Sequence, residues 1–183
     1  MAISTVREVL EFWFSLHAKP FWFHATPEFD QEVAAKFMAT YQAAREGELS
    51  GWKDTAQGAL ALVIVLDQFP LHMFRGEAQS FATEAAARQV AERAIHKDYD
   101  RQLTGEQKGF LYLPYMHSES LVDQEMSVML FMQAGLMDSL KWAVHHQDII
   151  RRFGRFPHRN QILGRESTPQ ELEYLASKEA LHG

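Results

Sequence analysis

Cysteine is absent from the 183-residue sequence. This absence excludes a disulfide framework, a thiolate nucleophile, an iron–sulfur cluster and any zinc site built on cysteine. Long apolar runs are scarce as well, since the longest, residues 59–66, is far shorter than the roughly 20 residues of a membrane span. The first residues carry Arg7 and Glu8 in an amphipathic pattern, which is not the layout of a signal peptide. We therefore expect a soluble, cytoplasmic protein with no membrane partner.

Basic residues are in the minority, because 18 Lys and Arg face 24 Asp and Glu for a net charge of −6. A chain of this charge does not present the broad basic surface that nucleic acids require, so no nucleic-acid partner is expected. The cations are unevenly spread, however. Residues 151–165 (RRFGRFPHRNQILGR) hold five arginines and no acidic residue. One electropositive segment on an acidic chain suits a small anion better than a long polyanion.

Strand patterns are also scarce, whereas helix signals recur along the whole chain. Residues 5–8, 104–107 and 168–171 each place Thr three residues before Glu or Gln, which is the capping box of a helix start. Residues 55–68 are almost entirely apolar and predict a buried helix that Phe69-Pro70 ends, because proline disfavours helical angles in the preceding residue. We predict an all-α protein of about seven to eight helices, forming a single domain over residues 1–183.

A histidine lies on the apolar stripe of the last long helix. Trp142, His146, Ile149 and Ile150 recur at helical spacing, which predicts that His146 faces inward. A buried imidazole needs a hydrogen-bond partner. It is either a core histidine held by a carbonyl or carboxylate, or an acid or base in a site.

The turn after that helix is rich in arginine and conformationally restricted residues. Gly154 suits a left-handed helix end and Pro157 stiffens the backbone. Arginine forks bind carboxylate or phosphate through two hydrogen bonds, and Asn and His add directional bonds. The projecting side chains form either a preorganised anion site or internal ion pairs with buried acidic residues; they are Arg155, His158, Arg159, Asn160 and Arg165.

Acidic residues near a predicted helix start suggest a metal site as an alternative. His117, Glu119 and Asp123 fall within seven residues and could join His146 or His158 around an ion. The Glu-x-x-His and His-Glu-x-x-His motifs of known metal helices do not occur in the sequence. Acidic residues at a helix start also favour the helix dipole without any ligand. We therefore predict no bound metal.

A third polar group follows the apolar helix, at Asp67-Gln68 and then Arg75. The Asp67 carboxylate is expected to be partly buried and to need a donor. An arginine of the basic turn is the natural candidate, which favours a structural ion pair.

These motifs resemble those of DUF924, a family of bacterial proteins of unknown function. The resemblance runs over nearly the whole chain, through residues 9–14 (VLEFWF), 66–70 (LDQFP), 73–76 (MFRG), 114–119 (PYMHSE), 146–160 and 163–165 (LGR). The family is similar to TPR-like helical domains, which implies helices packed as antiparallel pairs. Leu71-His72 stand where the family pattern usually has Arg-Asn, so the resemblance supplies no arginine at that point.

Two functions follow as hypotheses. In the first, the turn binds a small anionic ligand and is a candidate catalytic site, with the catalytic candidates His146, His158 and Glu119. The candidate ligand-binding residues are Arg155, Arg159, Asn160, Arg165, Arg75, Asp67, Gln68 and His117. In the second, the chain is a TPR-like scaffold for a peptide or protein partner, and the Arg and His motifs are structural. No nucleophile is evident, so no reaction is assigned. The sequence assigns no cofactor and no oligomeric state either.

Overall fold

A computed structural model of the protein describes residues 2–181, which divide into two compact units. The N-terminal unit contains residues 2–75 and 79–114, and the C-terminal unit contains residues 76–78 and 115–181. The described residues form no strand, which confirms the all-α prediction. The sequence has no linker at the boundary between the units, and the single domain stays a prediction.

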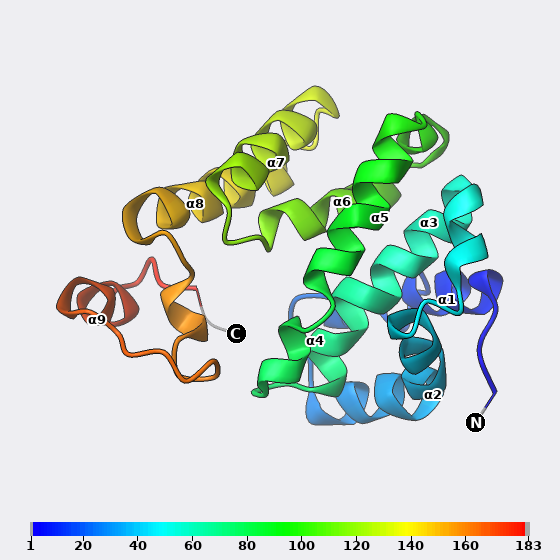
Figure 1. Ribbon diagram of the computed structural model, residues 1–183, viewed down its shortest axis with the longest axis horizontal. Helices are drawn as coiled ribbons and strands as arrows, with labels where there is room; N and C mark the ends of the chain where they lie inside the picture. The colour runs from blue at the N-terminus through cyan, green and yellow to red at the C-terminus, as the bar shows by residue number, and fades with distance from the viewer. Residues whose placement is uncertain (1, 182–183) are drawn as a thin grey trace. The chain divides into compact units, whose positions relative to one another are not determined.

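Short 3-10 turns lie between several of the α-helices that the described residues form (Figure 1). In chain order the α-helices are α1 (Val6–Trp13), α2 (Pro27–Arg45), α3 (Ala56–Val63), α4 (Phe69–Met73), α5 (Glu84–His96), α6 (Gly105–Met116), α7 (Leu121–Gln133), α8 (Met137–Phe153) and α9 (Pro169–Leu175).

The predicted capping boxes determine where several helices begin. At α1 the Glu8 N–H donates to the Thr5 hydroxyl at 3.2 Å, and the Thr5 N–H donates to the Glu8 carboxylate at 2.7 Å. The same reciprocal pair opens α9 between Thr168 and Glu171, at 3.2 and 2.8 Å. Each box satisfies N–H groups that have no partner inside the helix.

The predicted end of the apolar helix at Phe69-Pro70 is wrong. A π-helical segment, Ile64–Gln68, joins α3 to α4, and the helix continues to Met73. The Phe69 N–H donates to the Ile64 carbonyl, five residues back, and Phe69 keeps helical angles. This wider turn places Pro70 in the first turn of α4, where a missing N–H is tolerated. The Leu66 carbonyl, whose usual partner would be the N–H of residue 70, accepts instead from the Thr83 hydroxyl.

The continuous helix Ala56–Met73 is the single helix of the described residues that is long and apolar enough to cross a membrane. Of this window, 83% is buried inside the protein. Burial on this scale is typical of the core helix of a soluble helical protein, because its apolar side chains are already covered by other helices.

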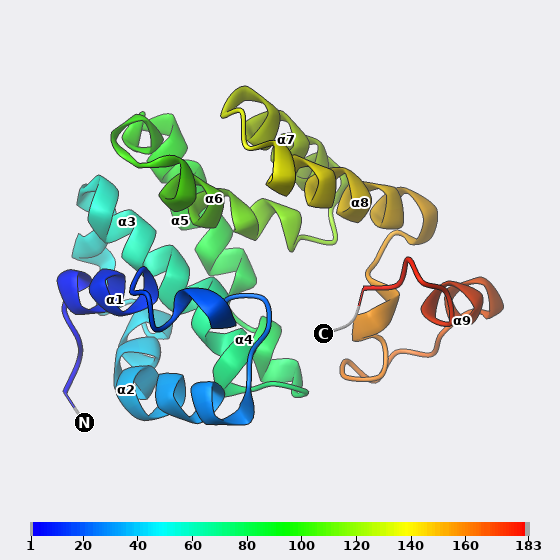
Figure 2. The same cartoon turned by 180° about the vertical axis from the view of Figure 1, so that it is seen from behind.

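The C-terminal unit is built on an antiparallel hairpin of α7 and α8, which lie side by side in both views (Figures 1 and 2). Helix α8 ends as predicted at Gly154, whose φ of 70° is left-handed. A short 3-10 turn, Pro157–Arg159, then leads through residues 160–168 to α9. The small core beneath these elements contains Ile149, Ile150, Phe156, Tyr174 and Ala180.

Candidate functional site

A bidentate ion pair between Glu119 and Arg165 joins the loop before α7 to the segment after the arginine-rich turn. Arg165 donates through Nη1 and Nη2 to the two Glu119 oxygens, at 2.7 and 2.9 Å. One of these oxygens also accepts the Phe156 N–H at 2.8 Å. Arg165 further donates to the Phe156 carbonyl at 3.1 Å and, through Nε, to Asn160 Oδ1 at 3.0 Å. Glu119 and Arg165 therefore fix the backbone of the turn from two sides.

A second fork ties the same turn to α9. Arg155 donates through Nε and Nη2 to the Glu171 carboxylate at 2.7 and 2.9 Å, and to the Glu166 carbonyl at 2.8 Å. Glu171 is buried, and it also accepts from Asn160 Nδ2 at 3.2 Å and from the Thr168 N–H. Asn160 bridges the two forks, because its oxygen binds Arg165 and its amide nitrogen binds Glu171.

The forks change the electrostatics expected of this segment. Among the five arginines of residues 151–165, Arg155 and Arg165 face carboxylates in close pairs, and Arg152 lies 3.4 Å from Asp148. Arg159 donates to the His117 carbonyl at 3.0 Å and stacks over the Phe156 ring at 4.8 Å. Much of the positive charge is thus balanced inside the C-terminal unit.

The carboxyl pKa values reflect these pairs. Hydrogen bonds from Arg155 lower the pKa of Glu171 to about 2 against the opposing effect of burial, and the Thr168 N–H contributes. At Glu119, burial alone would raise the pKa, but the hydrogen bonds from Arg165 and the Phe156 N–H outweigh it and lower the pKa. Both groups are carboxylates at neutral pH, and both oxygens of each accept hydrogen bonds.

His146 lies on α8, and its ring centroid is 5.5 Å from that of Phe156 in the turn. Its Nδ1 is 2.8 Å from the Trp142 carbonyl, so Nδ1 carries the proton and Nε2 holds a lone pair. Burial lowers the pKa of His146 to about 3; the Trp142 carbonyl opposes this shift, and the imidazoles of His117, His145 and His158 reinforce it. At neutral pH the ring is therefore neutral, able to accept a hydrogen bond at Nε2, and it is not the imidazolium that a general acid requires.

The inward stripe predicted for α8 needs one correction. Ile149 and Ile150 are buried, but Trp142 is 58% exposed and His146 is only partly buried. Trp142 contributes its backbone carbonyl to His146 while its indole ring stays outside. The helix presents a narrower apolar stripe than the spacing of these residues suggests.

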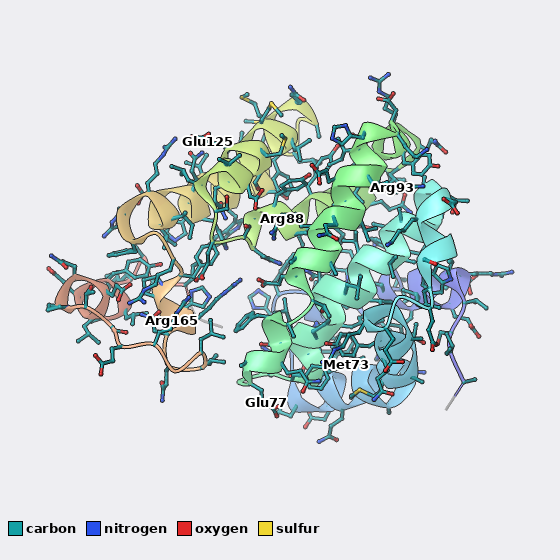
Figure 3. All side chains as sticks on the ribbon, in the orientation of Figure 1. Met73, Glu77, Arg88, Arg93, Glu125 and Arg165 are labelled. Atoms are coloured by element: carbon teal, nitrogen blue, oxygen red, sulfur yellow. The ribbon has the colours of Figure 1, made fainter. Side chains whose placement is uncertain are left out.

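An open groove of about 810 Å³ runs along the turn and α9. Its lining combines apolar and polar side chains, namely Pro157, His158, Gln161, Arg165, Glu166, Ser167, Leu172, Leu175 and Leu181. Figure 3 shows Arg165 on the segment between the turn and α9, next to which this groove lies. Two of the predicted site residues, His158 and Arg165, therefore line a concave surface.

The bonds of Arg165 within the described residues use four of its five N–H groups. A guanidinium has five N–H groups. Nε uses one, Nη2 uses two, and Nη1 uses one of its two in the bonds to Asn160, Phe156 and Glu119. One Nη1 N–H has no acceptor among the described residues.

The remaining predicted residues lie in the N-terminal unit. Gln68 donates to Asp67 at 2.6 Å, and both side chains are buried. Arg75 donates to the two Asp30 oxygens at 2.6 and 3.2 Å. A pair between Asp67 and an arginine of the basic turn would join the two units and stays a prediction.

Sequence reasoning missed two acidic partners, Asp30 and Glu171. Asp30 accepts from His72 Nδ1 at 2.7 Å as well as from Arg75. Its only sequence signal is its place in the first turn of α2, which is common for a solvated carboxylate. The sequence identifies Glu171 as a capping residue, and the same carboxylate also serves as the ion-pair partner of Arg155.

No group of three or more His, Asp or Glu side chains within residues 2–181 is arranged to hold a metal ion. Glu119 and Asp123 have other partners, since Glu119 binds Arg165 and Asp123 accepts from the Ser118 hydroxyl at 2.6 Å.

Comparisons with known proteins place this arrangement in a family. The family DUF924, described as a bacterial protein of unknown function, matches residues 9–179. The solved structure of a protein of unknown function from Agrobacterium tumefaciens is 38% identical, covers 93% of this chain and 96% of its own, and superposes with a TM-score of 0.89. None of the curated proteins matches the chain.

Proposed function

The chain belongs to the DUF924 family of bacterial proteins of unknown function, and we propose that it binds a small ligand with an apolar body and an anionic head. The observation that carries the proposal is the groove beside the arginine-rich turn, in which Leu172, Leu175 and Leu181 lie together with Arg165 and His158. Ligand sites commonly combine an apolar lining with a few oriented polar groups.

We assign the binding of the ligand's anionic head to the polar residues of the groove. The Nη1 N–H of Arg165 that has no acceptor among the described residues can donate to a carboxylate or phosphate oxygen, and Gln161 and His158 lie along the same lining. Because Glu119 balances the charge of Arg165, the head interacts mainly through directional hydrogen bonds. A singly charged head such as a carboxylate fits this better than a polyphosphate.

The arginine forks act as the frame of this site. Arg155, Asn160 and Glu171 hold the turn against α9, and Glu119 with Arg165 holds it against the start of α7. A frame fixed by five charged or amide side chains keeps the groove open without a ligand, which lowers the entropy cost of binding. A structural role for the Arg and Asn side chains is thus compatible with a ligand site beside them, because the ion pairs hold the groove in shape.

The same geometry suggests roles for two other candidate residues, Glu119 and His146. Glu119 positions the turn, since both of its oxygens accept hydrogen bonds from protein groups. His146 offers a lone pair at Nε2 and no acid function at neutral pH. The proposal is therefore one of binding, in the cytoplasm, with no reaction assigned.

A thermal-shift series with sodium acetate, sodium octanoate and inorganic phosphate tests this proposal. Octanoate should raise the melting temperature of the wild-type protein, whereas acetate and phosphate should raise it less, because both lack an apolar body. Leu172→Glu places a charge in the apolar part of the groove and should abolish the octanoate effect. Leu172 is 57% exposed, so the substitution itself should leave the fold intact.

Leu16→Glu is the matched control, since Leu16 is 89% exposed and lies in the N-terminal unit. This variant should respond to octanoate as the wild type does. Equal responses to octanoate and acetate, an unchanged octanoate effect in Leu172→Glu, or no response to any probe would each overturn the proposal.

A further inference from the structure

Helix α7 carries large apolar side chains on its exposed face as well as on its buried one. Its inner face buries Gln124, Ser127, Leu130 and Phe131. On the outside, Val122 is 72% exposed, Met132 57%, Leu121 40% and Met129 38%. A cluster of large apolar side chains on an exposed helix face is typical of a surface that contacts a partner.

The exposed apolar residues form one stripe. At 100° per residue, Leu121, Val122, Met129 and Met132 fall within an arc of about 100°, and they extend over roughly 16 Å of helix. Only Glu125 interrupts them, on the same arc, and Figure 3 shows it projecting from α7. We call these five residues, 121, 122, 125, 129 and 132, the α7 stripe. Three helical turns of apolar surface match the contact length of one short partner helix.

The charge of the stripe specifies its partner. Helix α7 contains Asp123 and Glu125 and no Lys or Arg. Glu125 is exposed and makes no hydrogen bond or ion pair with another residue in the described part of the chain. An exposed carboxylate among apolar side chains attracts a cation when a partner covers it, since desolvation then strengthens the pair.

We propose that the α7 stripe docks a basic amphipathic helix of another protein. The apolar face of that helix packs on Met129, Met132 and Val122, and a Lys or Arg beside it pairs with Glu125. Methionine side chains suit this role because they are flexible and adapt to partner surfaces of varied shape. This surface is distinct from the groove of the proposed function, which α7 does not line.

Two other occupants fit the stripe less well. A second copy related by two-fold symmetry would set the central Glu125 against its own symmetry mate, which places two carboxylates in contact. A membrane surface would require lysine or arginine next to the apolar face to meet anionic lipids, and α7 has neither.

Fluorescence anisotropy with two labelled synthetic peptides tests the proposal. One peptide forms a helix with leucine on one face and lysine on the other, and its match has glutamate in place of every lysine. The full chain should bind the lysine peptide and not the glutamate peptide. The double substitution Met129→Ser with Met132→Ser should weaken binding at least about tenfold, and Glu125→Lys should reverse the preference between the peptides.

Leu172→Ser is the control, because it alters an exposed leucine of the groove and leaves α7 intact; it should bind the lysine peptide as the wild type does. Circular dichroism checks that each variant stays folded. The proposal is overturned if the lysine peptide does not bind, if both peptides bind equally, if Leu172→Ser and the Met double variant lose binding alike, or if sedimentation shows a dimer that the Met double variant abolishes.

Discussion

At the scale of single residues, His146 shows how a neighbourhood sets the properties of one side chain. The ring donates from Nδ1 to the Trp142 carbonyl and lies near three other histidines, His117, His145 and His158. A proton on Nε2 would be poorly solvated and repelled by any neighbouring imidazolium, so the neutral ring is favoured. The folded state thus resists protonation of this group far more than the unfolded chain does.

The depressed pKa of His146 predicts a pH dependence of stability. The pKa is about 3 in the folded state, against 6.5 for an isolated histidine side chain. Between these values the unfolded chain binds one more proton, so the free energy of unfolding should fall by about 1.4 kcal/mol per pH unit as the pH drops below 6.5. Replacing the imidazole in His146→Gln should flatten this dependence. Urea unfolding at several pH values between about 4 and 7 measures it.

The control for this experiment is His96→Gln, an exposed histidine near the end of α5. Its unfolding free energies should follow the wild-type pH dependence. Parallel curves for His146→Gln and the wild type would show that His146 does not resist protonation in the folded protein.

At the scale of helices, the sequence predicted local features well and long-range ones poorly. The capping boxes at Thr5 and Thr168 were predictable because all their atoms lie within four residues. The continuation of the helix past Phe69-Pro70 was not, since it depends on the Thr83 hydroxyl, 17 residues away, satisfying the Leu66 carbonyl. The rule that proline ends a helix considers only the residue before it, so it cannot take account of such a distant partner.

The end of α8 gives a prediction at the same scale. Gly154 has a φ of 70°, and a Cβ built there would meet no atom within 4 Å. The cost of Gly154→Ala should therefore be purely conformational, about 1 kcal/mol of unfolding free energy. Chemical denaturation of the two proteins measures the difference.

Gly109→Ala is the matched control for this substitution. Gly109 lies inside α6, also without an atom within 4 Å of a built Cβ, and its φ is not positive. Alanine should stabilise this helix by up to about 1 kcal/mol. Equal effects of the two substitutions would mean that the left-handed angle at Gly154 carries no cost for alanine.

At the scale of the whole molecule, three of the five arginines in the basic segment 151–165 pair with carboxylates. Sequence reasoning located the polar groups and left open whether they form a site or internal struts. The pairs themselves depend on Glu119, 46 residues before Arg165, and on Glu171, 16 residues after Arg155. Pairings at these separations are fixed by how helices pack, and a single sequence contains no direct signal for them.

The buried Glu171 predicts a large stability effect. Glu171→Ala leaves Arg155, Asn160 and the Thr168 N–H without their shared acceptor, and should lower the free energy of unfolding by about 3 kcal/mol. Glu173→Ala, at an exposed position of the same helix, should change it by less than about 0.5 kcal/mol. Similar losses in the two variants would contradict the role of the fork.

The pair of Glu119 and Arg165 allows a stricter test, because Glu119 accepts a backbone hydrogen bond that an arginine in its place could not accept. The single substitutions Glu119→Ala and Arg165→Ala and their combination form a double-mutant cycle, which should give a coupling of about 1–3 kcal/mol. Exchanging the two residues, Glu119→Arg with Arg165→Glu, should not restore stability. The Phe156 N–H donates to Glu119, and a guanidinium at position 119 offers it no acceptor. Recovery of wild-type stability by the exchanged pair would show that charge attraction alone, without the hydrogen bond to the turn, holds this part of the frame together.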